Sequence, residues 1–274
     1  MLTFTGVFAL KAPPALALRP FVTTDADVAE PYEMELEWGL FGLTVEKEPG
    51  PDEVRIQVPS FRFNLGFPNV GLGDWELVLE SVHEFIDKKD RGLFDSDIDQ
   101  FKATGGFIKS VWYRGENWVP SVATEVGLLY PTERGAERAR GADFEGLVIM
   151  SWFLPSFTWH MTMGGATHHT TKGGLRETRA QYIFGTILDV PVPGRERFHV
   201  VGEYSGEKVE KEAVQHQLLG GVVWHGPWGM DFDAAGFGGL SAESVDWGGT
   251  AGVTISTKII RRRDWEIKRG RRFP

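Results

Sequence analysis

Apolar and polar residues alternate one by one along most of this chain. In the stretch 74–85, Trp75, Leu77 and Leu79 occupy odd positions, and Glu76 and Glu80 lie between or beside them at even positions. Successive side chains of a β-strand point to opposite faces, so such a segment has one apolar face and one charged face. Helical periodicity is almost absent, and the pattern therefore predicts an all-β protein.

Twelve segments carry this alternation and are predicted to be strands. They are residues 32–43, 54–66, 73–85, 104–114, 118–130, 144–154, 157–166, 177–190, 195–205, 213–225, 228–237 and 247–259. Pro59 interrupts the second of them. Because proline cannot donate a ladder hydrogen bond, we expect a bulge or a break at that position.

The gaps between these segments alternate in length. Long gaps follow the first, third, fifth, seventh and later odd-numbered segments, and they include 87–100, 131–143, 167–176 and 238–246. Short gaps include 115–117, 155–156 and 226–227. Short periplasmic turns and long external loops are typical of outer-membrane barrels. The sequence thus predicts a transmembrane antiparallel up-and-down β-barrel of about 12 strands, with lipid against its apolar face and a polar lumen.

The composition and charge of the chain narrow the range of possible functions. The chain has 34 Gly, 10 Trp and no Cys, and its formal net charge is −9. The absence of cysteine excludes disulfides and thiol catalysis, and the acidic balance disfavours nucleic-acid partners. Aromatic residues at strand ends fit the girdles found where a barrel meets the membrane surfaces. These residues are Trp75, Phe85, Trp118, Tyr130, Trp152, Trp224, Trp228 and Trp247.

The two ends of the chain differ from the barrel segments. Residues 1–17 are mostly apolar and include Ala15-Leu16-Ala17, which resembles a signal-peptide cleavage site, although Lys11 and two prolines interrupt the run. Residues 1–20 are interpreted as a signal-peptide remnant or an N-terminal arm, and residues 21–260 as the barrel. Residues 261–274 form a basic tail in place of the terminal aromatic residue that closes many barrels.

Four stretches resemble an outer-membrane barrel family named for the MetA-pathway of phenol degradation, a family of transporters. They are Arg19–Asp25 with Met34–Gly39, Gly71–Asp74, Pro120–Ala123 with Tyr130–Gly135, and Gly202–Tyr204 continuing to Gly252. The resemblance covers most of residues 20–260. It implies a channel or transporter-like barrel for passive passage of small molecules, with apolar or aromatic compounds as associated cargo. It implies no catalytic residue and no cofactor.

The polar faces of the predicted strands bring ionisable side chains into the lumen. The candidate lining residues are Arg62, Glu76, Glu80, Glu84, Lys109, Glu125, His160, Arg179, His199, Glu203, Asp231, Asp233 and Lys258. Two hypotheses account for them. They form a mixed-charge pore lining that contacts small-molecule solutes, or they form a salt-bridged network that fills the barrel.

The sequence offers other candidate sites and other classes of function. His168 and His169 are adjacent and would point to opposite faces, so no metal site is expected in the external loop predicted for them. The acidic stretch from Asp87 to Asp99 lacks the full spacing of a calcium loop. A lipid-modifying hydrolase using Ser81 and His83 is one alternative, and a soluble ligand-binding barrel with its faces inverted is another. The oligomeric state stays open.

Overall fold

Antiparallel pairing between strands that follow one another in sequence organises the whole fold. The computed structural model describes residues 23–46, 53–57, 60–69, 73–88, 95–131, 142–172, 175–242 and 244–258. The strands are β1 Glu33–Glu46, β2 Glu53–Gln57, β3 Ser60–Phe67, β4 Asp74–Lys88, β5 Asp95–Tyr113, β6 Ser121–Pro131, β7 Asp143–Leu154, β8 Phe157–Lys172, β9 Leu175–Val192, β10 Arg195–Val209, β11 Gln215–His225, β12 Met230–Gly239 and β13 Trp247–Lys258. A short 3-10 turn, Pro227–Gly229, links β11 to β12.

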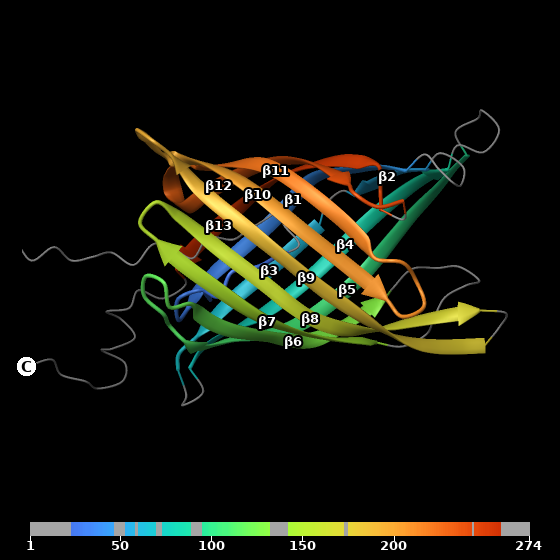
Figure 1. The fold of residues 1–274 in the computed structure, drawn as a ribbon, viewed down its shortest axis with the longest axis horizontal. Coiled ribbons are helices and arrows are strands. Elements are labelled where there is room, and N and C mark those ends of the chain that lie inside the picture. Colours follow the sequence, from blue (N-terminus) through green and yellow to red (C-terminus); the bar gives the residue numbers. More distant parts are fainter. Residues whose placement is uncertain are drawn as a thin grey trace, which may run out of the picture.

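The sheet closes on itself. β1 pairs with β13, from Glu33 opposite Lys258 to Val45 opposite Trp247, and the tilted strands form a barrel (Figure 1). β2 and β3 both pair with β1 on one side and with β4 on the other, so they share one position in the barrel. The thirteen strands therefore occupy twelve positions, and the predicted antiparallel barrel is confirmed. Pro59 lies outside the described residues. The pairing with β1 keeps one register from β2 to β3, whereas the pairing with β4 shifts by one residue between them.

The two faces of the sheet differ as the alternation predicts. The outer face carries exposed apolar side chains on most strands, including Trp38, Leu79, Ile108, Val126, Leu128, Val148, Met163, Leu188, Val200, Leu218 and Val222. The inner face carries buried polar side chains, including Glu37, Glu76, Lys109, Glu125, Ser151, His160, Asp189, Glu203 and Asp233. A soluble barrel with inverted faces is therefore excluded.

Aromatic pairs cluster on the outer face at the end of the barrel that carries the short turns. Trp152 and Trp159 stack with ring centroids 4.5 Å apart, and Trp224 and Phe232 stack at 5.3 Å. Phe67 and Trp75 form a third pair on the same rim, at 4.3 Å. Such pairs fit an interfacial girdle. The side chain of Phe85 lies outside the described residues.

Two predicted loops are strands in the structure. The pairing of β4 with β5 continues to Lys88 opposite Asp95, and that of β8 with β9 continues to Lys172 opposite Leu175. The β8–β9 hairpin extends past the neighbouring strands, and it is the yellow hairpin at the right of Figure 1. The expectation of loops at 87–100 and 167–176 was therefore wrong. Because antiparallel pairing needs no lipid, a hairpin can continue beyond the membrane.

No helix within the described residues is long and apolar enough to cross a membrane. The interpretation of residues 1–20 and 261–274 concerns segments outside the described residues.

Candidate functional site: the lumen and an internal segment

Residues 23–31, here named the lumen segment, precede β1. Residues 23–29 lie inside the barrel, whereas Glu30 and Pro31 are exposed. Thr23, Ala26 and Ala29 are each at most 1% exposed. Tyr32 then donates its backbone N–H to the Gly66 carbonyl of β3 at 2.9 Å. Residues 23–29 of the lumen segment are therefore enclosed by the wall of the barrel.

Side chains from three separated strands bind the backbone of the lumen segment. The bonds run from the Ala29 amide to Glu76 Oε2 of β4 at 2.7 Å, from the Ala26 amide to Ser151 Oγ of β7 at 2.7 Å, and from the Thr23 amide to Glu203 Oε1 of β10 at 2.6 Å. Because these strands lie on different sides of the barrel, the lumen segment crosses the lumen. The bonds also satisfy amides that no sheet partner reaches.

An apolar patch on the inner wall holds the middle of the lumen segment. Ala26 and Val28 pack with Val111, Ala123, Leu147 and Ile149 of strands β5 to β7. Apolar burial and hydrogen bonding therefore act together on this stretch.

Ion pairs fix the acidic residues of the lumen segment. Lys109 Nζ lies 3.1 Å from Asp25 Oδ1 and 3.6 Å from Glu76 Oε1. At the turn end, Arg114 binds Asp27 and also Asp74, the latter at 3.2 Å. Partial burial lowers the pKa of Arg114, but these two carboxylates outweigh that effect and raise it above its usual value. Arg114 therefore stays charged.

A second cluster surrounds Arg62. Its guanidinium lies 2.7 Å from Glu125, 3.5 Å from Glu80 and 3.9 Å from Glu37. The Asn64 amide donates to Glu37 at 2.8 Å. One cation thus holds together carboxylates from β1, β4 and β6, which would otherwise repel one another.

Ser151 and His160 form a buried pair beneath the lumen segment. Ser151 Oγ lies 2.7 Å from His160 Nδ1, and His160 Nε2 has no hydrogen-bond partner among the described residues. Since Ser151 Oγ also accepts the Ala26 amide, the pair positions the lumen segment.

The structure brings most of the thirteen candidate residues into the lumen. Buried and inward-facing are Glu76, Lys109, Glu125, His160, Glu203 and Asp233, with Arg62 and Glu80 partly buried beside them. His199 binds Asp189 at 2.7 Å and Asp231 binds His225 at 2.9 Å, both at the turn end. The Glu84 side chain lies outside the described residues.

Two of the candidates do not line the lumen. Arg179 lies on β9 opposite His168 of β8, past the end of the β10 ladder at Val209, and it binds Glu177 at 2.9 Å and Glu212 at 2.6 Å. Lys258 is exposed at the end of β13 and pairs with Glu30. Alternation assigned both to the correct face, but it does not show how far along the barrel a residue lies.

The structure describes both histidines of the predicted loop, but it describes only part of the Ser81 and His83 pair of the hydrolase alternative. His168 and His169 lie on β8, and His169 Nδ1 contacts Asp143 Oδ1. Ser81 lies on β4 at the parity of the exposed Leu79, so it faces outward. The His83 side chain is outside the described residues, and the hydrolase alternative stays a prediction.

Sequence reasoning missed the lumen segment itself. The stretch Thr23-Thr24-Asp25-Ala26-Asp27 lacks the alternation of a strand and consists of small or acidic residues. Small side chains suit a chain that is enclosed by a barrel wall. The run of small residues was therefore the sequence signal that could have indicated an internal segment. Glu35, Glu145 and Ser205 also face inward and were absent from the candidate set.

Gly66 tests the fit of the lumen segment. A Cβ atom at position 66 would lie 2.2 Å from the Glu30 carbonyl oxygen, so Gly66→Ala is expected to displace the lumen segment and raise single-channel conductance. A Cβ atom at Gly202 would meet nothing within 4 Å, and Gly202→Ala is the matched control. Equal conductance of the two variants in planar bilayers would contradict this account.

Comparison with known proteins supports the fold. No protein-family model and no curated protein sequence matches the chain. Among solved structures, an outer membrane channel from Pseudomonas putida F1 superposes with a TM-score of 0.61 at 7% identity, covering 85% of this chain and 97% of that one. The resemblance to the phenol-degradation family itself has no sequence match and stays a prediction.

Two further structures have the same architecture. The NanC porin gives a TM-score of 0.53 at 8% identity, with coverage of 81% of this chain and 98% of that one. The β-domain of the Bordetella autotransporter BrkA gives a TM-score of 0.52 at 13% identity, with coverage of 82% of this chain and 98% of that one. Together with the apolar outer face and the closed sheet, these likenesses show that the chain has the fold of a bacterial outer-membrane β-barrel.

Proposed function

We propose that this protein is a passive outer-membrane channel for small solutes, and that it prefers cationic and neutral polar solutes to anionic ones. Its lining supports this role rather than catalysis. Inward-facing carboxylates are Glu35, Glu37, Glu76, Glu80, Glu125, Glu145, Asp189, Glu203 and Asp233. Among the described residues, Arg62 and Lys109 lie in the same space, and the carboxylates exceed these cations.

The excess of carboxylates is the observation that carries the proposal. A lumen lined by one sign of charge concentrates counter-ions and repels ions of its own sign. Apolar and aromatic cargo, which the family resemblance implies, has less support, because the apolar inner patch of β5 to β7 is covered by the lumen segment. The lumen segment narrows the route, so we expect small conductance steps.

Single-channel recording of the refolded protein in a planar bilayer tests the proposal. Under a potassium chloride gradient the reversal potential is expected to show potassium permeating more readily than chloride. Anion selectivity, or a folded barrel that conducts no ions, would contradict the proposed channel.

Glu145→Gln is expected to reduce the preference for potassium. Glu145 faces the lumen beside Leu147, and it forms no ion pair with another described residue, so the substitution removes the carboxylate without breaking an ion pair. Glu116→Gln removes the same charge from the exposed β5–β6 turn and is the control. Equal shifts of the reversal potential in both variants would show that lumen charge does not set selectivity.

A further inference from the structure

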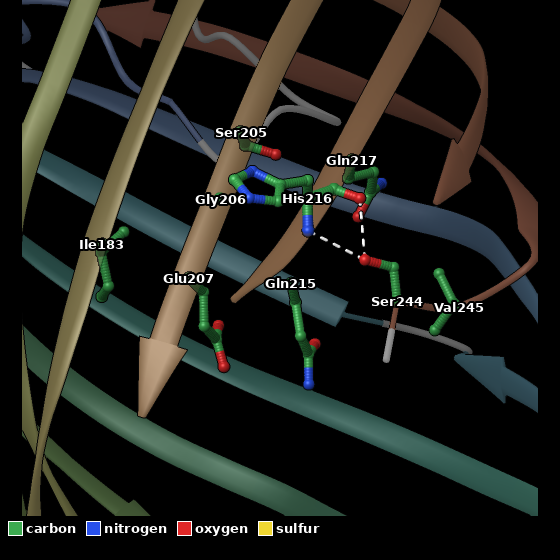
Figure 2. Close-up of a pocket in the computed structure, with 9 residues that line it drawn as sticks. All are labelled: Ile183, Ser205, Gly206, Glu207, Gln215, His216, Gln217, Ser244 and Val245. Atoms are coloured by element: carbon green, nitrogen blue, oxygen red, sulfur yellow. Dashed lines mark hydrogen bonds between the residues drawn. The ribbon is translucent and has the colours of Figure 1, made fainter. Parts of the chain in front are cut away.

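A cavity of about 110 Å³ with both polar and apolar walls lies between β9, β10 and β11 at the loop end of the barrel. Its walls include Ser205 and Glu207 of β10 and Gln215 and Gln217 of β11 (Figure 2). At about 10–15 Å³ of such space for each water, the cavity has room for roughly seven to eleven water-sized atoms. It is separate from the ion-pair clusters around Arg62 and Lys109.

Strand register places these four side chains in two facing pairs. Ser205 is directly opposite Gln217, and Glu207 is directly opposite Gln215. Because residues two apart on a strand share a face, all four lie on the inner side. Their side chains form no hydrogen bond or ion pair with another described residue. They therefore present free hydrogen-bonding groups to the cavity.

The loop between β12 and β13 forms a fixed wall of this cavity. Ser244 Oγ accepts the backbone N–H of His216 at 2.8 Å and donates to the His216 carbonyl at 2.8 Å, as the dashed lines in Figure 2 show. Ser241 Oγ lies 2.6 Å from Ser244 Oγ and donates to the Val214 carbonyl at 3.0 Å. The cavity is thus preformed, which lowers the entropic cost of binding.

The side chains that line the cavity favour a ligand that is positively charged and donates hydrogen bonds. Glu207 supplies a carboxylate, and the two glutamines and Ser205 supply uncharged acceptors and donors. The His216 imidazole is hydrogen-bonded to the Tyr204 hydroxyl at 2.8 Å, and within the described part of the chain no lysine or arginine lines the cavity. A carboxylate that binds an ammonium group gives a stronger hydrogen bond than one that binds a hydroxyl.

We propose that this cavity binds small, hydroxyl-bearing primary ammonium compounds before they enter the acidic lumen. Glu207 binds the ammonium group, while Gln215, Gln217 and Ser205 bind the hydroxyls. Because the inference names the class of solute that the channel would carry, it rests on the proposed channel function. Binding itself is measured without any current, so loss of binding and loss of conduction are separate results.

Calorimetric titration of the refolded full chain in detergent micelles tests this site with three probes of nearly equal size. Serinol (2-amino-1,3-propanediol) has an ammonium group in place of the central hydroxyl of glycerol, and glycerate has a carboxylate in place of one terminal hydroxymethyl group of glycerol. Serinol is expected to bind about tenfold or more tightly than glycerol, and glycerate is expected not to bind.

Substitutions identify the groups responsible. Glu207→Gln is expected to remove the preference for serinol over glycerol, and Gln217→Leu to weaken both. Glu210→Gln, which removes the same charge from the exposed turn after β10, is expected to change neither. Equal binding of serinol and glycerol to the unmodified chain would overturn the proposal, and so would an unchanged preference in Glu207→Gln. Retention of heat-modifiable migration shows that each variant is folded.

Discussion

A chain that begins at Tyr32, and so lacks the lumen segment, is expected to conduct about threefold or more current per open channel than the full chain. The segment crosses the lumen between β4, β7 and β10, and its removal leaves water in its place. The measurement is single-channel conductance in a planar bilayer, with heat-modifiable migration as the check that the shortened barrel is closed.

A synthetic peptide with the sequence of residues 19–31 provides the matched control. Added to the shortened barrel, it is expected to lower the conductance again, whereas a peptide in which Asp25 and Asp27 are both Lys is not. The reversal of both charges places cations beside Lys109 and Arg114, so the peptide should not dock. If the shortened barrel conducts no more than the full chain, the lumen segment is not the constriction.

Arg62→Met is expected to lower the free energy of unfolding by about 3 kcal/mol or more, because it leaves the carboxylates of Glu125, Glu80 and Glu37 together without their cation. Urea unfolding in lipid vesicles, followed by tryptophan fluorescence, measures the change. Arg114→Met removes an exposed arginine from the turn end and is expected to cost less than about 1 kcal/mol.

A double substitution separates charge from packing. Arg62→Met combined with Glu125→Gln is expected to recover part of the lost stability, because one of the repelling charges is then removed. If Arg62→Met and Arg114→Met destabilise equally, or if the double variant is no better than the single one, the Arg62 cluster does not act through charge.

The alternation of residues was enough to predict the barrel and to assign its faces. The apolar residues Leu77 and Leu79 and the charged residues Glu76 and Glu80 follow a period of two. An error of one residue in the register would exchange the apolar and polar faces completely. The position of a residue along the barrel axis was not predictable in the same way. By alternation Arg179 is on the lumen side of β9, but it lies beyond the ends of β7 and β10. The length of the β8–β9 hairpin depends on how far its two strands pair beyond the membrane.

The internal contacts were beyond sequence reasoning for a different reason. The position of Ala26 against Ser151 depends on a segment without periodicity meeting a wall 125 residues away in sequence. The same holds for the cavity at Glu207, which needs the β12–β13 loop to fold back onto His216. Such contacts come from tertiary structure, and neither propensity nor spacing encodes them.

The pairing of β1 with β13 also constrains the order in which this protein assembles. Glu33 meets Lys258, so the last contact of the barrel joins nearly the two ends of the described chain. Such non-local pairing is slow, because the entropy of closing the longest loop must be lost before the contact forms. Until β13 arrives, the sheet has two open edges that can pair with other copies. The interval before closure is therefore when the chain most needs protection from aggregation.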